Sequence, residues 1–363
     1  MTPIQNRLSR KHLLRVFGII TAQKAALMVL LLVYPTLFPA LFSASGGGRE
    51  FQTWDTGGYL EIARGGYGSG ELCALYPLWP ACIKAAALLI GGRALAASYV
   101  LANLLSLGGL LMFHRLVWEK VGLASAYGAT LILLFFPGAM FFLVPYSESL
   151  FFFLLMVCLL CLQRKAYGGA AAAAALLPLT RATGIFVLPL MAREVFRNRA
   201  PLRTYAICVA PLAGYAAYFG IMWRCTGSGM AGFDAQRMFP SQPCVANLLD
   251  LPGFVHCFLG FGWRHDFLHS FIDRLVFVAY LLTLFWVIRL DLGYYAYALL
   301  AGMVPALSVS LMSFTRYCAL VFPVFIVWGS LPKKGWCIAF ILLLFFGLQV
   351  MFLLLHVSGR WAG

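Results

Sequence analysis

The sequence predicts an all-α polytopic membrane protein with about eleven membrane segments. Of its 363 residues, 62% are hydrophobic and 11% are charged, and the mean hydropathy is +0.87. Soluble domains carry about 25% charged residues. Apolar runs of about 20 residues, long enough to cross a bilayer, recur along the chain, and the short alternating segments of a β-barrel are not seen. No polar stretch is long enough for a separate soluble domain, so residues 1–363 are expected to form a single integral-membrane domain.

The charges predict how the chain is oriented. The net charge is +15, and the basic residues gather at the ends of the apolar runs, as the positive-inside rule describes. The excess therefore indicates topology and attraction to membrane lipids, not nucleic-acid binding. A basic flank before the apolar run to Phe38 places the N-terminus in the cytoplasm and predicts a retained first helix instead of a cleaved signal peptide. The expected location is the bacterial inner (plasma) membrane, or the ER membrane if the chain is eukaryotic.

Two polar loops separate the apolar runs, at about 42–77 and about 224–269, and both are expected outside the cytoplasm. In the first loop, glycine-rich breaks flank about ten residues that are expected to form a short interfacial helix. Nine spans are expected over the ranges 13–38, 94–118, 123–144, 150–162, 205–223, 271–289, 293–312, 317–331 and 335–357.

Two further ranges have alternative interpretations. Residues 78–92 form either a short span or an interfacial helix, and the interfacial form is favoured because the basic residues at 115–120 and 164–165 then lie in the cytoplasm. Residues 168–192 then form a short broken hairpin, with Arg181 near the outer face.

The most informative stretch is the first polar loop, where Asp55 follows Trp54 directly after the first apolar segment. A carboxylate beside aromatic rings is typical of sugar-handling sites, because it can take a hydroxyl proton while the rings hold the sugar. Asp55 is therefore the candidate catalytic base, and a helix N-cap is its alternative role. Tyr59, four residues on, shares its helical face, whereas Glu61 lies near that face but not on it. Substrate positioning is expected of five residues, with interfacial anchoring the alternative for the aromatic ones: Trp54, Tyr59, Glu61, Tyr67 and Tyr76.

Two arginines lie where the sequence is otherwise apolar. Arg181 is surrounded by about 25 apolar residues, and an arginine at the bilayer centre costs about 2.5–3.5 kcal/mol on insertion scales. Arg316 separates two expected spans on the outer side, where positive charge is disfavoured. A guanidinium binds phosphate well, so both are candidates for binding a lipid phosphate, and snorkelling to the interface is the alternative for Arg181. The adjacent Tyr317 is expected to help position the substrate.

Tyr146, Ser147 and Glu148 begin a segment of nearly pure Leu and Phe. Ser147 suits a helix cap, and Glu148 suits the positive end of the helix dipole. The functional alternative is that Glu148 and Tyr146 orient the substrate.

The ten cysteines and six histidines give weak signals for metals or disulfides. Cys158 and Cys161 have C-x-x-C spacing within an apolar helix, which favours buried thiols. Cys244 and Cys257 can form a disulfide if their loop is extracytoplasmic. His265 and His269 have i, i+4 spacing in a loop with His256 and Asp266, so a zinc site there is an alternative. We expect no metal or other cofactor, with a divalent ion not excluded.

Several motifs together resemble the GPI mannosyltransferase II (PIG-V) family and its bacterial relatives. The most specific is the block from Phe136 to Phe151, which is similar to the family's "FP…FF…YSESLF". The others occur in the family's order over roughly residues 10–330: Trp54-Asp55-x-x-x-Tyr59-x-x-Ile62-Ala63-x-x-Gly66-Tyr67, Tyr76-Pro77-Leu78, Arg181-Ala182-Thr183-Gly184, Phe233-x-x-Gln236, and Arg316-Tyr317 with Phe322-Pro323. The chain departs from the family at Gly58, where a second aromatic is usual, and at Gly227-Ser228-Gly229, where Gly-Asp-Pro is usual.

The resemblance implies a GT-C glycosyltransferase fold with its site at the outer face and a polyprenyl-phosphate-linked sugar, typically mannose, as donor. The acidic residue of the family's first loop maps onto Asp55, and Gln236 joins the residues expected to position substrate. The acceptor is expected to be linked to a lipid or a glycan.

The resulting hypothesis is an inverting, metal-independent transferase. Asp55 removes the acceptor proton, and Arg181 and Arg316 bind the donor phosphate. The alternatives are a lipid-linked sugar transporter or flippase, and a non-catalytic membrane subunit of a glycosylation complex. The sequence carries no signal for the oligomeric state.

Overall fold

The computed structural model describes residues 10–39, 50–68, 70–239, 244–260, 265, 270–308, 311–331 and 334–362. Every regular element within these ranges is helical, and no strand occurs in them. The expected all-α architecture is therefore confirmed.

Five elements are long and apolar enough to cross a membrane, in the part of the chain that the structure describes. Four are single helices, α1 (Arg10–Leu37), α5 (Ala94–Val121), α13 (Phe271–Leu290) and α17 (Gly335–Val357). The fifth joins η6 (Leu202–Val209) to α10 (Ala210–Thr226). A helix rises about 1.5 Å per residue, so the longest exceed the roughly 30 Å of bilayer hydrocarbon. Large apolar side chains on their outer faces are exposed, as lipid contact requires.

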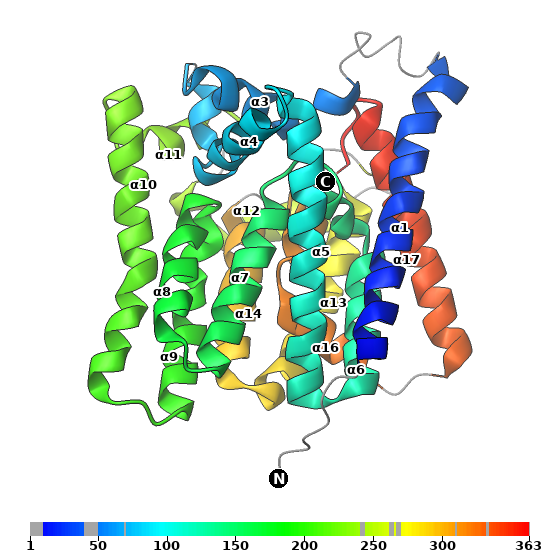
Figure 1. Cartoon of the computed structure of the whole chain (residues 1–363), viewed down its shortest axis with the longest axis vertical. Coiled ribbons are helices and arrows are strands. Elements are labelled where there is room, and N and C mark those ends of the chain that lie inside the picture. The colour runs from blue at the N-terminus through cyan, green and yellow to red at the C-terminus, as the bar shows by residue number, and fades with distance from the viewer. Residues whose placement is uncertain are drawn as a thin grey trace.

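Six shorter helices join in pairs (Figure 1). The first pair is α6 (Leu123–Phe135) and α7 (Glu148–Gln163), the second α8 (Tyr167–Leu176) and α9 (Leu188–Arg197), and the third α14 (Leu292–Ser308) and α16 (Phe322–Ser330). Irregular or 3₁₀ segments connect the helices of each pair: η3 (Pro137–Phe142), η4 (Leu177–Leu179) with η5 (Ala182–Val187), and the short helix α15 (Phe314–Cys318).

Two expected spans are wrong in their extent. The range 123–144 is not one helix, because α6 ends at Phe135 and Phe136 is extended before Pro137. A residue before proline disfavours the α conformation. The range 317–331 likewise is not one helix, because it begins within α15, which ends at Cys318, and α16 starts only at Phe322. The broken hairpin expected within 168–192 does occur, as α8, η4, η5 and α9.

The backbone between α6 and α7 is irregular yet buried, so its carbonyls need donors. Side chains from distant helices supply them. Gln349 donates to the carbonyls of Leu134 (3.1 Å) and Phe136 (3.2 Å). Lys24 donates to Phe142 at 2.9 Å. Further donors to this segment are Ser106 to Phe142, Asn103 to Leu143 and Trp79 to Pro145. This irregular segment is therefore held in place by side chains from α1, α4, α5 and α17.

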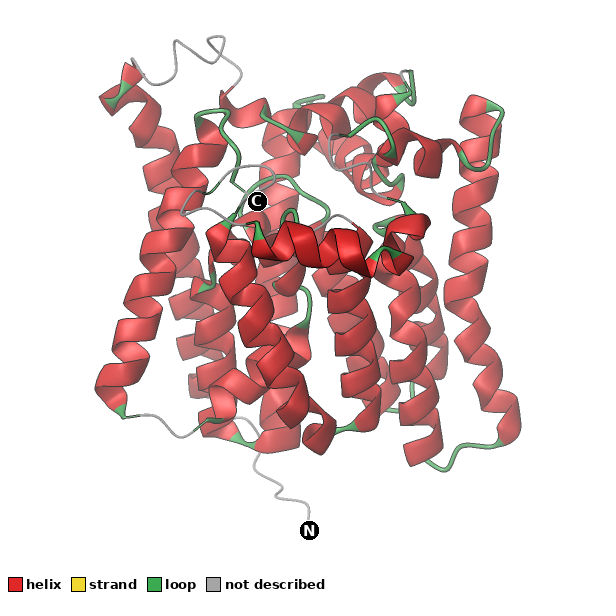
Figure 2. Ribbon diagram, turned by 180° about the vertical axis from the view of Figure 1, so that it is seen from behind, coloured by secondary structure: helices red, strands yellow, loops and turns green. Residues whose placement is uncertain are grey.

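The two ends of the molecule differ in character (Figure 1). The end near the N-terminus carries the turns α5–α6, α7–α8, α9–η6, α13–α14 and α16–α17, which are rich in basic residues: Lys120, Arg164, Lys165, Arg197, Arg199, Arg289 and Lys334. The other end is covered by the short helices η1 (Glu50–Gln52), α3 (Asp55–Gly65), η2 (Glu71–Ala74), α4 (Leu78–Leu89) and α11 (Ala231–Gln236). The short helix expected in the first loop is thus present, as α3. Figure 2 shows a further helix, α12 (Leu251–Leu259), lying across the bundle.

We predict that Gln349→Leu destabilises the protein, because the Phe136 carbonyl loses its side-chain donor, while the Leu134 carbonyl and the Gln23 amide keep only their 3.4 Å bond to each other. A buried polar group left unsatisfied costs about 1–3 kcal/mol. The measurement is the thermal unfolding midpoint in detergent. Leu343→Ala, on the exposed face of the same helix, is the matched control and should leave the midpoint nearly unchanged. Equal shifts in the two variants would contradict this account.

Candidate functional site

Asp55 is the first residue of α3 and faces the interior of the molecule. The N-cap position belongs to Trp54, not to Asp55, and Trp54 has a positive φ of 53°. This uncommon conformation turns the chain sharply into the helix. The Asp55 carboxylate then forms an ion pair with Arg316, with 2.9 Å between Asp55 Oδ2 and Arg316 Nη2. The Asp55 side chain is 30% exposed. Asp55 is therefore an ion-paired carboxylate that remains open to solvent.

Glu148 is the first residue of α7, and its side chain is completely buried. Its Oε1 lies 2.6 Å from Nη1 of Arg181 and also accepts a short hydrogen bond from Nε of Arg316. The N-terminus of a helix favours negative charge, so α7 adds to the stabilisation of this carboxylate. Its second oxygen, Oε2, is buried without a hydrogen-bond partner.

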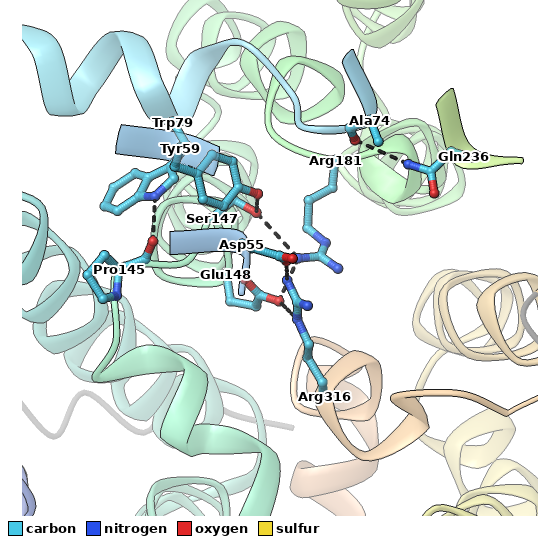
Figure 3. Close-up of polar contacts among 10 residues, drawn as sticks. All are labelled: Asp55, Tyr59, Ala74, Trp79, Pro145, Ser147, Glu148, Arg181, Gln236 and Arg316. Atoms are coloured by element: carbon cyan, nitrogen blue, oxygen red, sulfur yellow. Dashed lines mark hydrogen bonds and ion pairs between the residues drawn. The ribbon is translucent and has the colours of Figure 1, made fainter. Parts of the chain in front are cut away.

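The four charged side chains form one continuous chain, Asp55–Arg316–Glu148–Arg181, in which opposite charges alternate (Figure 3). The formal charges of the two carboxylates and the two guanidiniums sum to zero. Each arginine side chain is only 11% exposed, and a buried charge is costly unless it is paired. We call these four residues the charged cluster.

The charged cluster lies where the connections of the three short helix pairs meet α3. Glu148 follows η3, Arg181 separates η4 from η5, and Arg316 belongs to α15. Gly138 of η3 packs so closely against the Thr315 carbonyl of α15 that a Cβ there has no room. The breaks in the three pairs thus bring residues far apart in sequence to one place.

Aromatic rings surround the two guanidiniums. The Arg316 guanidinium carbon lies 4.5 Å from the ring centre of Tyr146 and 4.9 Å from that of Phe141. The Arg181 carbon lies 5.2 Å from the ring centre of Tyr317. Such contacts attract a cation and limit its motion, so both arginines are held in defined orientations.

Hydroxyl groups complete the site. Tyr59 donates to Ser147 Oγ at 3.1 Å, and Arg181 Nη1 donates to the same oxygen at 3.3 Å. Burial raises the pKa of the Tyr59 phenol, so it stays neutral and remains a donor. Ser147 occupies the N-cap position of α7, as the sequence suggested, but its side chain makes no cap hydrogen bond and links α3 to the charged cluster instead.

The other residues expected to position substrate lie outside the charged cluster. Tyr67 donates to the Leu75 carbonyl at 2.8 Å, Tyr76 stacks on Tyr218 with ring centres 4.7 Å apart, and Gln236 donates to the Ala74 carbonyl at 3.1 Å. Figure 3 shows Gln236 to one side of the charged residues. These three residues pack α3, η2, α10 and α11 together.

Two more of these residues face away from the charged cluster. Glu61 is on the exposed side of α3. Trp54 is 43% exposed and meets Trp361 edge to face, with ring centres 5.7 Å apart.

Sequence reasoning missed His356 and Thr53. His356, near the end of α17, lies 3.2 Å from Thr53 Oγ1 through Nε2, and its ring contacts those of Phe141 and Tyr146. It therefore fixes the segment directly before Trp54. A single histidine near the end of a long apolar helix was the only signal in the sequence.

Histidines and cysteines do not form a metal centre in the described residues, where no group of three or more possible ligands occurs. His265 bonds to Ser270 Oγ at 2.8 Å and stacks on Phe352, while His269 lies outside the described residues. Cys244 donates to Asn247 Oδ1 at 3.0 Å and is not joined to Cys257 by a disulfide.

Comparison with known proteins adds no identity: no protein-family model and no curated protein matches this chain. The site must therefore be interpreted from its own geometry.

We predict that Glu148→Gln strongly destabilises the protein, because it leaves two buried arginines with Asp55 as their one remaining acidic partner in the cluster. Removing one partner of a buried ion pair costs about 3–5 kcal/mol. The matched control is Glu119→Gln, which breaks an exposed pair with Arg115 worth about 0.3–0.5 kcal/mol. Thermal unfolding of both variants in detergent tests this. Similar small shifts would show that the charged cluster is solvated and loosely held.

Proposed function

We propose that this chain is a membrane glycosyltransferase of the GT-C type. It moves a sugar, mannose in the simplest case, from a polyprenyl-phosphate donor to a lipid- or glycan-linked acceptor, with inversion at the anomeric carbon. The observation that carries the proposal is the convergence of a solvent-accessible carboxylate, Asp55, with two buried arginines, Arg181 and Arg316, at one place. A transfer of this kind needs one base and a cationic site for the departing phosphate.

In the proposed orientation the N-terminal end faces the cytoplasm, because the basic turns gather there. The charged cluster then lies toward the extracytoplasmic side, beneath α3 and α4. Eleven helices serve as membrane segments: α1, α5, α6, α7, α8, α9, α10, α13, α14, α16 and α17. The apolar helix α4 is placed at the interface with α3.

In the reaction, Asp55 takes the proton of the acceptor hydroxyl. The acceptor oxygen forms a bond to the anomeric carbon while the bond from that carbon to the phosphate oxygen breaks. The electron pair leaves with the polyprenyl phosphate, and Arg181 and Arg316 neutralise its charge. The sugar configuration inverts because attack and departure take place on opposite faces.

Arg316 must change partners for this reaction to occur. Its Nη2 now binds Asp55, while its Nε binds Glu148. A donor phosphate brings negative charge that competes for Nη2, and Asp55 is then released as a base. Donor binding therefore precedes deprotonation of the acceptor, and Glu148 keeps both arginines in place throughout.

The presence of an apolar cavity supports the proposal that the substrate is linked to a lipid. Its volume is about 670 Å³, and it lies between α1 and α5, with Met28, Leu32 and Leu104 in its wall. Phe51, close to Trp54 in the chain, also lines it. A polyprenyl tail fits an apolar space of this kind on the membrane-facing side.

A non-catalytic membrane subunit is the second candidate, because the charge balance within the cluster also suits a purely structural ion-pair network. The two candidates differ in the role of Asp55. The first requires its chemistry, whereas the second requires only its contact with Arg316.

We predict that Asp55→Asn abolishes sugar transfer in a folded protein. Asparagine keeps the size and can accept a hydrogen bond from Arg316, but it cannot take a proton. General-base catalysis contributes about 10²–10⁴-fold, so a loss of at least about 100-fold is expected. The assay uses purified protein in detergent, radiolabelled polyprenyl-phosphate mannose and a panel of lipid, glycan and peptide acceptors. Glu71→Gln, an exposed acid of the same loop, is the control.

The outcomes separate the candidates. Loss in Asp55→Asn with activity retained in Glu71→Gln supports the transferase and its base. Equal transfer by all three proteins keeps the transferase and rejects Asp55. No transfer by wild type with any acceptor rejects the enzyme or the donor, and a flipping assay in liposomes then tests the transporter.

We predict that Arg316→Lys raises the KM for the donor about tenfold or more. Arg316 uses two different nitrogens to bind Glu148 and Asp55 at once, and a lysine has one nitrogen and no planar fork for phosphate. A tenfold change corresponds to about 1.4 kcal/mol. Steady-state kinetics over a range of donor concentrations measure it. An unchanged donor KM would remove Arg316 from the phosphate site.

A further inference from the structure

The first turn of α13 holds two adjacent buried charged residues, Asp273 and Arg274, with 0% and 4% exposure. Neither forms an ion pair with an opposite charge within the described part of the chain. Ionisable residues at membrane depth are expensive and are usually kept for function. The hydrogen bonds of these two side chains show which backbone segments they hold in place.

Asp273 holds the segment that carries Arg316. Its Oδ1 accepts a hydrogen bond of 2.6 Å from the backbone N–H of Thr315. Its other oxygen, Oδ2, is buried and has no hydrogen-bond partner among the residues that the structure describes. A buried carboxylate with one oxygen unsatisfied is costly, and its place in the first turn of α13 offsets part of that cost.

The turn before α15 needs such support. Leu311 and Ser313 both have positive φ angles, 66° and 60°, which are uncommon for residues other than glycine. On the other side of α15, the Thr315 carbonyl is packed against Gly138. Asp273 and η3 thus clamp Thr315 by its N–H and its carbonyl, directly beside Arg316.

Arg274 fixes the same turn of α13 through contacts with a different helix, α12. Its guanidinium donates to the carbonyls of Cys257 (2.5 Å) and Phe258 (3.1 Å) in the last turn of α12. It also donates to Ser270, at 2.9 Å, within its own turn. A cation at a helix C-terminus satisfies carbonyls that lack partners. The turn that presents Asp273 is therefore anchored on both sides and has little freedom to shift.

We propose that Asp273 is a positioning residue for Arg316: it fixes the backbone of Thr315, and so sets where the guanidinium meets a lipid-linked phosphate. This inference rests on the proposed function for the role of Arg316. Asp273 itself touches no substrate. It acts through the Thr315 amide alone.

The test uses full-length protein in detergent with the variants Asp273→Ala and Asp273→Asn. Alanine removes the acceptor for the Thr315 N–H, whereas asparagine keeps an acceptor oxygen at the same place. Two measurements are made on folded, monodisperse protein. One is the Kd for undecaprenyl phosphate, followed by tryptophan fluorescence, and the other is the donor KM and kcat in the transfer assay.

Asp273→Ala is expected to raise the Kd and the donor KM about tenfold, with kcat changed less than about threefold, because uniform binding is lost. Asp273→Asn is expected to restore both to within about threefold of wild type. Asp291→Ala is the matched control. Asp291 Oδ1 also accepts a backbone N–H, that of Gly293 at 2.8 Å, but at the opposite end of α13. It is expected to lower thermal stability without changing the Kd.

An unchanged Kd in folded Asp273→Ala overturns the proposal, as does an equal rise in Asp291→Ala, which marks a general effect of destabilisation. Failure of Asp273→Asn to restore binding also overturns it. The binding measurement keeps this proposal apart from the transferase. If wild type binds undecaprenyl phosphate but transfers nothing, the proposed function fails and the effect of Asp273 on Arg316 is still decided by the Kd.

Discussion

The pairing of buried charges is the constraint on which this structure depends. Arg181, Arg316 and Glu148 lie where water is largely excluded, and none of them is stable there alone. Alternation along the charged cluster gives every guanidinium a carboxylate and shares Glu148 between both arginines. Because these residues come from the start of α7, the η4–η5 break, α15 and α3, satisfying the charges requires four distant segments to meet. The position of α3 over the bundle follows from the same requirement, through Asp55.

The short helix pairs are the means by which these segments meet. A continuous helix satisfies its own backbone but presents side chains only at its sides, whereas a broken one places a helix start within the membrane interior. The cost is a set of unpaired carbonyls between Leu134 and Pro145. Polar side chains in otherwise apolar helices, among them Gln349 and Lys24, remove that cost. By holding the irregular segment before α7, these residues help to determine the position of Glu148.

Under the proposed function this structure is a resting state, in which the positive charge of the two arginines is balanced by protein carboxylates instead of a phosphate. Such balance lets two arginines remain in an apolar environment without a ligand, and it makes an arriving anion a competitor for existing bonds. Competition is strongest at Arg316, which bonds to the one partly exposed acid of the cluster, Asp55. The proposed support of Thr315 by Asp273 would keep the backbone fixed while the guanidinium changes partner. Binding and catalysis would then be linked through a side-chain movement alone.

The sequence by itself determined the class of the protein and the residues with chemical potential. Low charge and long apolar runs establish helical membrane segments. Hydropathy also made Glu148, Arg181 and Arg316 conspicuous, because charge in apolar surroundings needs a reason, and Asp55 stood out by its aromatic neighbours. The helix in the first loop and the break near Arg181 followed from glycines and prolines. The expected roles in glycosyl transfer came from a resemblance of motifs, and they remain proposals.

Only the tertiary structure decided which of these residues meet. Hydropathy does not distinguish a full membrane span from a half-length helix buried in protein. The predicted spans therefore ran past the C-terminus of α6 and began before the N-terminus of α16. Sequence distance says nothing about contact between Asp55 and Arg316, or between Asp273 and Thr315, because those contacts are set by the packing of helices far apart in the chain. For the same reason the sequence did not show that Gln236, Tyr67 and Tyr76 lie outside the charged cluster, where they make contacts between neighbouring short elements. Local composition determines which secondary structure a segment can form. The pairing of buried polar groups across the fold determines its position in the tertiary structure.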